Sequence, residues 1–344
     1  MTTNEKELFE SVDLCTPDGL LLNRAALGWS RRPLHRANLD GRFGLNKRWD
    51  YWAILAGDLV VSTTFADLDH LGLADVYWVD LASGESGGQS IVTGAGDGIS
   101  LPDVAGATPL HVERGRFFLT IEDHEGWTHL SAQWSEPDGR EGSFDIVVAL
   151  PRDHESLNVV IPWSDELFNF TSKHQARSAT GALSVGSRNW NIGGQGDATA
   201  WGVLDVGRGR WPARINWNWG GGAGRSGGHV IGIQFGAKWT EGSGFTENGL
   251  IVDGRLSKLG RELDWEYDWD HPMRPWRVSD PGGQLDCELS PRFDKHSALE
   301  VSDDLGSETH QVFGTWSGRF ESDDGVKGEF VGLQGFAEEA RQRW

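Results

Sequence analysis

Hydrophobic and polar residues follow one another along most of this chain in short runs that are typical of β-strands. Val, Ile, Trp, Phe and Thr recur in these runs, and Gly, Asp, Asn and Pro separate them. Short apolar runs bounded by turn residues favour strands over helices. The pattern predicts one series of strands within residues 51–163 and a second within residues 181–335. Three short stretches have a helical pattern, and they are residues 5–12, 164–168 and 337–344.

These runs predict an all-β protein built as sandwiches or barrels. A polar segment near residues 165–180 interrupts the rhythm of the strands and leaves two parts of similar size. A chain of 344 residues is also longer than one typical domain. We therefore expect two β-barrel-like domains, residues 15–170 and residues 171–340.

The charge of the chain limits its partners. Asp and Glu number 51 against 31 Lys and Arg, which gives a formal net charge of −20. Such a surface repels nucleic acid and anionic membranes, so neither is an expected partner. The chain has 18 Trp but only 3 Tyr, so indole rings are expected to dominate one cavity or surface.

Targeting signals and cysteines indicate the expected compartment. The first residues are polar, and no apolar run approaches the roughly 18 residues of a membrane-spanning helix. The two cysteines, Cys15 and Cys287, are far apart in the sequence and match no metal-binding spacing. We expect a cytoplasmic protein with two unpaired thiols and no integral membrane segment.

Cofactor motifs give no support for a bound cofactor. Residues 222–227 match G-x-G-x-x-G, but the residues that follow predict a strand, whereas a dinucleotide site requires a helix there. The sequence contains no P-loop and no H-E-x-x-H motif, and its 11 His are scattered. We therefore expect neither a cofactor nor a metal site.

A first candidate site lies in residues 46–52, Asn-Lys-Arg-Trp-Asp-Tyr-Trp, at the start of a predicted strand. Strand alternation places Arg48, Asp50 and Trp52 on one face, and Trp49 and Tyr51 on the other. An inward-facing Asp50 that pairs with Arg48 would be a buried carboxylate beside an indole. The alternative is a purely structural ion pair at the mouth of a barrel.

A second candidate site lies in residues 217–249. Trp217 and Trp219 alternate on a predicted strand, and a loop with two carboxylates follows further along. Burial of a carboxyl group among aromatic rings would raise its pKa toward the working range of a general acid. The alternative is a solvated connecting loop. The residues of interest here are Trp217, Trp219, His229, Trp239, Glu241, Glu247 and Asn248.

Four ordered motifs carry a resemblance to a known family. Residues 28–34, 47–52, 217–219 and 242–254 are similar to those of the bacterial family known as domain of unknown function 2804, over roughly residues 15–335. The resemblance implies a relationship to two-domain, lipocalin-like proteins such as carotenoid hydratases, tocopherol cyclase and fungal cyclisation enzymes. It implies lipocalin-like barrels, or strongly curved antiparallel sheets, around an apolar ligand. It assigns no catalytic residue.

The leading hypothesis is a cofactor-independent enzyme that uses acid-base chemistry at a double bond of a hydrophobic small molecule, such as a terpenoid or lipid. The reaction would be hydration, dehydration, isomerisation or cyclisation. Indole faces would stabilise positive charge on the substrate. The expected catalytic residues are Glu247, Asp50, Glu241 and His229. The expected substrate-binding residues are Arg48, Trp49, Trp52, Trp217, Trp219, Trp239 and Asn248.

Two other functions fit the same residues. A non-catalytic carrier of an apolar ligand needs the cavity without the acid. A carbohydrate-active enzyme or sugar-binding protein also uses tryptophan platforms and pairs of carboxylates. The shape of the pocket discriminates between them, because sugars favour an open, wet groove and lipids a closed, apolar one.

Overall fold

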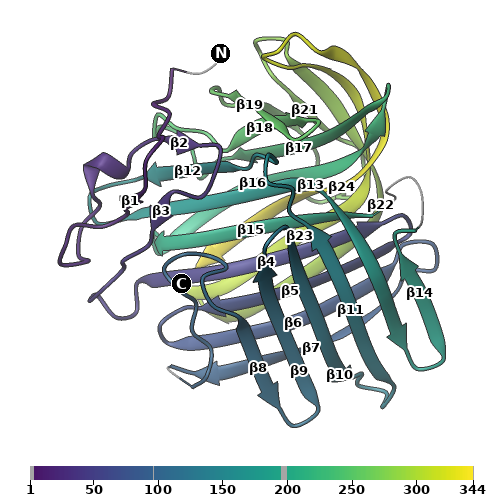
Figure 1. Ribbon diagram of the computed structural model, residues 1–344. Helices are drawn as coiled ribbons and strands as arrows, with labels where there is room; N and C mark the ends of the chain where they lie inside the picture. Colours follow the sequence, from purple (N-terminus) through teal and green to yellow (C-terminus); the bar gives the residue numbers. More distant parts are fainter. Residues whose placement is uncertain (1–3, 96, 195–199, 344) are drawn as a thin grey trace.

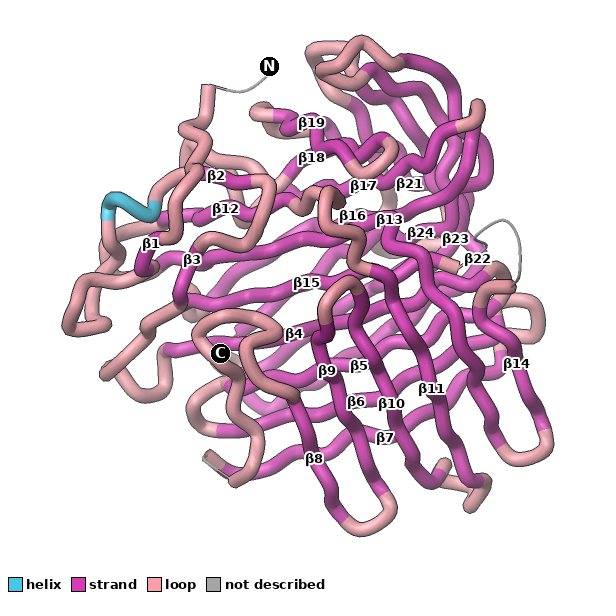
Figure 2. Tube along the Cα trace, in the orientation of Figure 1, coloured by secondary structure: helices cyan, strands magenta, loops and turns pink. Residues whose placement is uncertain are grey.

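The computed structural model of the chain describes residues 4–95, 97–194 and 200–343. Within these residues the regular structure is almost entirely strand, as Figure 2 shows. The one helical element described is a single 3₁₀ turn, η1 (Arg24–Ala26). The predicted all-β class is therefore confirmed. Among the described residues, no helix has the length and apolar character needed to cross a membrane.

The first sheet has 13 antiparallel strands and curves into a near-closed barrel (Figure 1). In sheet order its main path consists of β7 (Glu85–Gly94), β6 (Leu71–Asp80), β5 (Leu59–Asp67), β4 (Asn46–Ala56), β15 (Trp201–Arg210), β13 (Phe168–Val185), β11 (Glu141–Ala149), β10 (Trp127–Ser135), β9 (Phe117–His124) and β8 (Leu110–Arg114). Off this path, β12 (Leu157–Pro162) pairs with β13 and with β2 (Trp29–Ser30), and β14 (Arg188–Ile192) pairs with β13. A separate small sheet pairs β1 (Val12–Asp13) with β3 (His35–Arg36).

The second sheet has nine antiparallel strands and forms a half-barrel. In sheet order these strands are β19 (Arg255–Leu259), β18 (Asn248–Val252), β17 (His229–Ala237), β16 (Arg214–Ser226), β24 (Lys327–Arg343), β23 (Leu305–Glu321), β22 (Leu285–Ser302), β21 (Trp276–Ser279) and β20 (Asp264–Glu266). Together the two sheets confirm the expected pair of strongly curved antiparallel sheets.

Strand β13 is long because it serves two parts of the first sheet. Its first half pairs with β12 and β15, and its second half pairs with β11 and β14. A bulge between His174 and Arg177, where Ala176 has a φ of +59°, redirects the strand between the two halves. The polar segment near residues 165–180 that suggested a domain boundary thus lies mostly inside a strand. The chain passes from one sheet to the other between Arg210 and Arg214. The division into two domains at residue 171 stays a prediction about folding units.

The three expected helical stretches are wrong. Residues 5–12 and 164–168 contain no helix, and residues 337–343 are the end of β24. This last segment consists of helix formers such as Ala, Glu and Arg, but it pairs with β16 on one side and β23 on the other. Pairing on both edges, together with burial of Ala337 and Ala340, outweighs the small helix preference of these residues.

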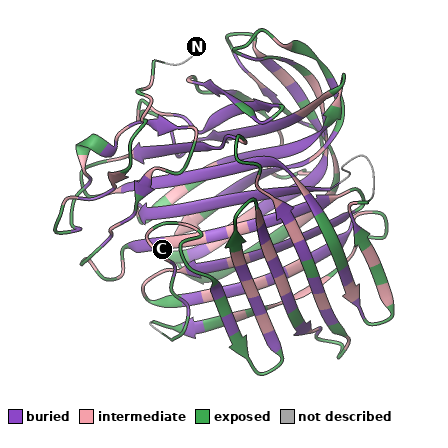
Figure 3. Ribbon diagram, in the orientation of Figure 1, coloured by how far each residue is buried: buried purple, intermediate pink, exposed green. Residues whose placement is uncertain are grey.

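Apolar side chains fill both curved sheets and the space between them. Trp52, Trp134 and Leu183 belong to the core of the near-closed barrel, and Trp276 and Trp316 belong to the core of the half-barrel. A further cluster joins the sheets, and it includes Ala53, Val203, Trp219, Phe313 and Phe336. Strands β13, β15 and β16, which lie where the sheets meet, are largely buried in Figure 3.

The predicted unpaired state of Cys15 and Cys287 is confirmed.

Candidate active site

A cavity of about 400 Å³ lies between the two sheets. Strands β4, β5, β6, β13 and β15 line it from the first sheet, and β16, β22, β23 and β24 line it from the second. The loop between β17 and β18 adds Trp239 and Glu247. Its exposed wall is mainly apolar, and its volume is within the usual range for sites that bind small molecules.

One wall of the cavity is a row of side chains on neighbouring strands. Tyr51 on β4 lies opposite Asp205 on β15, and Asp205 lies opposite Lys173 on β13. Two positions further along β15 from Asp205, Gly207 leaves room for Trp49, because a Cβ atom at Gly207 would lie 2.0 Å from the indole. The indole N–H of Trp49 donates to Asp205 Oδ2 at 3.2 Å.

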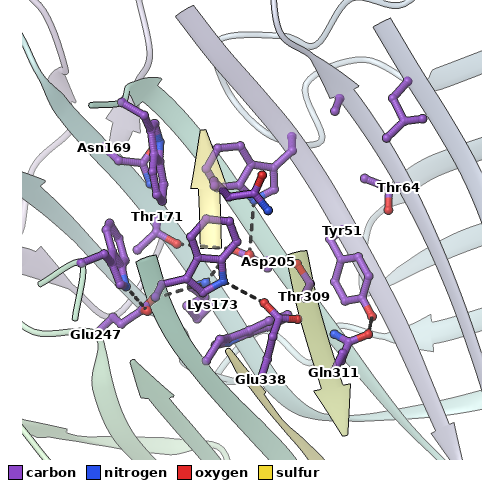
Figure 4. A pocket seen from close by; sticks show the side chains of 18 of the residues that line it. Tyr51, Thr64, Asn169, Thr171, Lys173, Asp205, Glu247, Thr309, Gln311 and Glu338 are labelled. Carbon is purple, nitrogen blue, oxygen red and sulfur yellow. Dashed lines mark hydrogen bonds and ion pairs between the residues drawn. The ribbon is translucent and has the colours of Figure 1, made fainter. Parts of the chain in front are cut away.

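The opposite wall is a matching row on the second sheet. Trp219 on β16 lies opposite Glu338 on β24, Glu338 lies opposite Gln311 on β23, and Gln311 lies opposite Lys295 on β22. The two rows meet where Tyr51 packs against Trp219 with ring centroids 5.6 Å apart and its hydroxyl donates to Gln311. In Figure 4 the labelled side chains of the two rows, Tyr51, Lys173, Asp205, Gln311 and Glu338, gather around the cavity.

Lys173 is the central cation of the site. Its Nζ lies 2.9 Å from Asp205 Oδ1 and 3.2 Å from Glu247 Oε2, and 4.6 Å from the centre of the Trp219 ring. Burial alone would lower the pKa of Lys173, but the two carboxylates outweigh this effect and raise it. Lys173 therefore stays charged and compensates part of the negative charge of the site.

Glu247 is a buried carboxyl group with a raised pKa. Its side chain is 1% exposed and lies over Gly236, where a Cβ atom would approach Glu247 Oε1 to 1.9 Å. The indole N–H of Trp239 donates to Oε1 at 2.6 Å. Burial raises the pKa of Glu247 to about 7, although Lys173 and the Trp239 hydrogen bond act in the opposite direction. A carboxyl group with this pKa can donate and accept protons at neutral pH.

Glu338 is a second carboxyl group of the same kind. It is buried and accepts a hydrogen bond of 2.7 Å from the indole N–H of Trp217. Burial raises the pKa of Glu338 to about 7, and the Trp217 hydrogen bond and the positive charge of Lys173 only partly offset this effect. The cavity thus combines the central Lys173, and Lys295 on the opposite wall, with three carboxyl groups, of which Glu247 and Glu338 have pKa values raised to about 7.

Indole rings surround these polar groups. Trp211 packs on Trp239 with nearly parallel rings 5.3 Å apart, and also contacts Trp49 and Trp217. Five tryptophans line the cavity, and they are Trp49, Trp211, Trp217, Trp219 and Trp239. We call these five residues the tryptophan wall.

The structure brings together part of the site expected from the sequence. Glu247, Trp49, Trp217, Trp219 and Trp239 all line the one cavity. The expected alternation on β4 is also correct, because Trp49 and Tyr51 share the cavity face.

Asp50, Arg48 and Trp52 do not lie in the cavity, and the expected position of Asp50 there is wrong. They occupy the other face of β4, where Trp52 is part of the barrel core. Asp50 pairs with Arg208 at 2.7 Å, and Arg48 pairs with Asp103 at 3.2 Å, so the expected Arg48–Asp50 pair does not form. Both faces of β4 are covered, one by the barrel core and the other by the second sheet, so the alternation alone does not identify the cavity face.

Three residues of the second candidate segment also lie outside the cavity. Glu241 is exposed on the turn that follows Lys238. His229 lies at the start of β17, where its Nδ1 is 2.6 Å from Asp253 Oδ2. Asn248 is buried and holds the loop in place, since it accepts from Gly236 N and donates to Arg261 O. Hairpin position and backbone bonding thus explain these three residues.

The sequence interpretation missed Lys173, Asp205, Trp211 and Glu338. Lys173 lies in the segment that suggested a domain boundary, and Glu338 in the segment that suggested a helix. The alternation of Asn169, Thr171 and Lys173 along a strand was a usable signal, because all three line the cavity.

A group of side chains that could hold a metal ion lies away from the cavity. The ligand atoms of His296, Glu308 and His310 lie within 4.8 Å of one another. Their strand neighbours Lys295, Thr309 and Gln311 line the cavity, so alternation places this group on the opposite face of the sheet.

A family model matches residues 5–344, and its description is domain of unknown function (DUF2804). The chain belongs to this family. The resemblance expected from the four sequence motifs is therefore confirmed. No curated protein sequence matches the chain.

Several solved structures resemble this DUF2804 protein. A protein described as AttH from Nitrosomonas europaea has 11% sequence identity and a TM-score of 0.51, over 88% of this chain and 94% of the other. Kievitone hydratase from Nectria haematococca has 13% identity and a TM-score of 0.48, over 99% and 98%. CghA has 12% identity and a TM-score of 0.45, over 87% and 88%. At these identities the likeness concerns the fold alone.

Proposed function

We propose that this protein is an enzyme that protonates a double bond of a hydrophobic small molecule in the cavity between the sheets, with Glu247 as the proton donor. The observation that carries the proposal is a carboxyl group that is 1% exposed, lines an apolar cavity and has a pKa of about 7. Such a group is protonated in a large fraction of molecules at neutral pH, which a solvent-exposed glutamate is not.

The cavity also suits the positive charge that protonation creates on carbon. The tryptophan wall presents aromatic rings to the ligand, and each ring contributes about 0.5–2 kcal/mol to a nearby cation. Asp205, held by Lys173 and the Trp49 indole, offers an anion at the same wall. Both features favour the charged intermediate more than the neutral substrate, which is the requirement for catalysis.

Glu338 supplies the matching base. When Glu247 gives its proton to one carbon, an ionised Glu338 can take a proton from a neighbouring carbon, which completes an isomerisation or a cyclisation. If water attacks the cation instead, Glu338 takes the proton that the water loses, which completes a hydration. The two carboxyl groups have similar pKa values, so one acid and one base are available near pH 7.

Solvent isotope incorporation tests this proposal. The purified protein is incubated in D₂O with an apolar cell extract and a panel of isoprenoid alkenes and alcohols, and mass spectrometry records deuterium in the products. Each of these reactions places a solvent hydrogen on carbon, so the wild-type protein should produce deuterated compounds. E247Q should produce none while it still binds the same ligand. E329Q, which changes an exposed glutamate on β24, is the matched control and should behave as wild type.

The same experiment evaluates the carrier hypothesis. A ligand that is bound equally by wild type and E247Q, without deuterium in any compound, would show a carrier and contradict the enzyme. Deuteration by E247Q at the wild-type rate would contradict the role of Glu247. The cytoplasmic location stays a prediction from the sequence.

A further inference from the structure

Asn169 is a buried polar side chain in the cavity without a hydrogen-bond partner. It is 0% exposed, and neither its Oδ1 nor its Nδ2 has a partner within the described part of the chain. It lines the cavity on the same face of β13 as Thr171 and Lys173. Buried amides in folded proteins are nearly always hydrogen-bonded, so an unbonded one that borders a cavity is available to a polar group inside the cavity.

Trp211 provides a second unbonded group near the same place. Its indole N–H is buried and has no acceptor among the described residues, although the ring lines the cavity. The other four indoles of the tryptophan wall all have acceptors, since Trp49, Trp217 and Trp239 donate to carboxylates and Trp219 donates to Gln234 Oε1 at 3.2 Å. Trp211 thus differs from its neighbours in keeping a free donor.

The register of the strands brings these two groups to one end of the cavity. Asn169 lies opposite Gly209 on β15, and Trp211 follows two residues after Gly209. A Cβ atom at Gly209 would lie 2.8 Å from Asn169 Oδ1, so the glycine leaves the space that the amide occupies. Asn169 lies four residues from Lys173, which corresponds to about 13 Å along a strand.

We propose that Asn169 and Trp211 form a polar subsite that binds a hydroxyl group of the hydrophobic ligand. A hydroxyl group both donates and accepts, so it can donate to Asn169 Oδ1 while it accepts from Trp211 Nε1 or Asn169 Nδ2. This inference rests on the proposed function in one respect, that the ligand occupies this cavity. It adds that the substrate is an oxygenated molecule whose hydroxyl group binds beside Asn169 and Trp211, rather than a pure hydrocarbon.

Two probes of nearly the same shape test the subsite. The binding of 2-naphthol and of 2-methylnaphthalene to the full chain is measured by quenching of tryptophan fluorescence. We expect wild type to prefer 2-naphthol by about tenfold or more, because the methyl compound leaves the buried amide and indole unbonded. N169L should bind both probes about equally, and W211F, which keeps an aromatic ring, should retain part of the preference.

A stability measurement separates ligand binding from a structural role. Without ligand, N169L should have a thermal midpoint equal to or above that of wild type, because the substitution removes an unbonded amide. N216L, at an exposed position on β16 outside the cavity lining, is the control and should keep the preference for 2-naphthol. Equal affinity of wild type for the two probes, no binding of 2-naphthol up to its solubility limit, or a preference that survives in N169L would overturn the inference.

This test is independent of catalysis. A preference for 2-naphthol that depends on Asn169, in a protein that incorporates no deuterium, would retain the subsite and reject the enzyme. Deuterium incorporation by a protein whose preference for 2-naphthol does not depend on Asn169 would retain the enzyme and reject the subsite.

Discussion

Lys173 on β13 and Glu247 before β18 form an ion pair of 3.2 Å that joins the two sheets. Lys173 belongs to the near-closed barrel, and Glu247 belongs to the half-barrel. The charge of the lysine therefore acts on the acid only while the two sheets are packed together. The site is a property of the junction between the sheets, and neither sheet contains it alone.

The stability of the protein should depend on pH through Glu338. The pKa of Glu338 is about 7 in the folded chain, against an ordinary value of 4.5. The Glu338 carboxyl group ionises more easily in the unfolded chain than in the folded one. Its contribution to the free energy of unfolding is therefore fully present below the unfolded pKa and is lost as the pH rises through 7. E338Q removes this loss. Its free energy of unfolding relative to wild type should increase by about 2 kcal/mol between pH 5.5 and pH 8.5.

Urea denaturation at several pH values measures this difference. E329Q is the control and should differ from wild type by a constant amount, since Glu329 is exposed. A constant difference for E338Q as well would show that Glu338 is ionised throughout this range.

Removal of Lys173 should destabilise the fold strongly. K173M leaves Asp205 and Glu247 buried without their cation, and breaking a buried pair in this way typically costs about 3–5 kcal/mol. The cost should be larger at pH 8.5 than at pH 5.5, because protonation of Glu247 relieves the repulsion. Chemical denaturation at both pH values measures it. K327M, at an exposed lysine on β24, should change stability little. A loss for K173M as small as that for K327M would contradict the central role of Lys173.

Gly236 should be required for the position of Glu247. In G236A the new methyl group overlaps Oε1, Cγ and Cδ of Glu247, so the carboxyl must move away from Trp239. We expect a loss of about 1–3 kcal/mol in the free energy of unfolding. In an E247A background the same methyl group has room, and the loss should largely disappear. G94A, where no atom lies within 4 Å of the added group, is the control. An equal loss in both backgrounds would show that another contact resists the methyl group.

The fold and half of the site could be predicted from sequence for a clear physical reason. Strand alternation and turn residues are local signals, and they correctly gave the all-β class and the two faces of β4. The aromatic and acidic loop also contains Glu247, but its composition does not tell which carboxyl group is buried, because Glu241 on the same loop is exposed.

The missing half of the site depends on which strands meet. Asp205 lies on β15, whose partner β4 is distant in sequence. Glu338 lies on β24, which pairs with its hairpin neighbour β23 and with the distant strand β16. The polar side chains of β13 suggest a boundary between domains in the sequence. In the structure the first half of this strand is buried on both faces. A single sequence carries no local mark of such pairing.

The most direct test of the central claim is the titration of Glu247 itself. Glutamate labelled with ¹³C at the side-chain carboxyl is incorporated into E338Q, and the carboxyl signals are followed by NMR from pH 5.5 to pH 8.5. We expect a signal with a midpoint near pH 7 that is absent from the E247Q/E338Q double variant. If every signal lost on introducing E247Q titrates below pH 5.5, Glu247 is ionised at neutral pH and does not act as the acid.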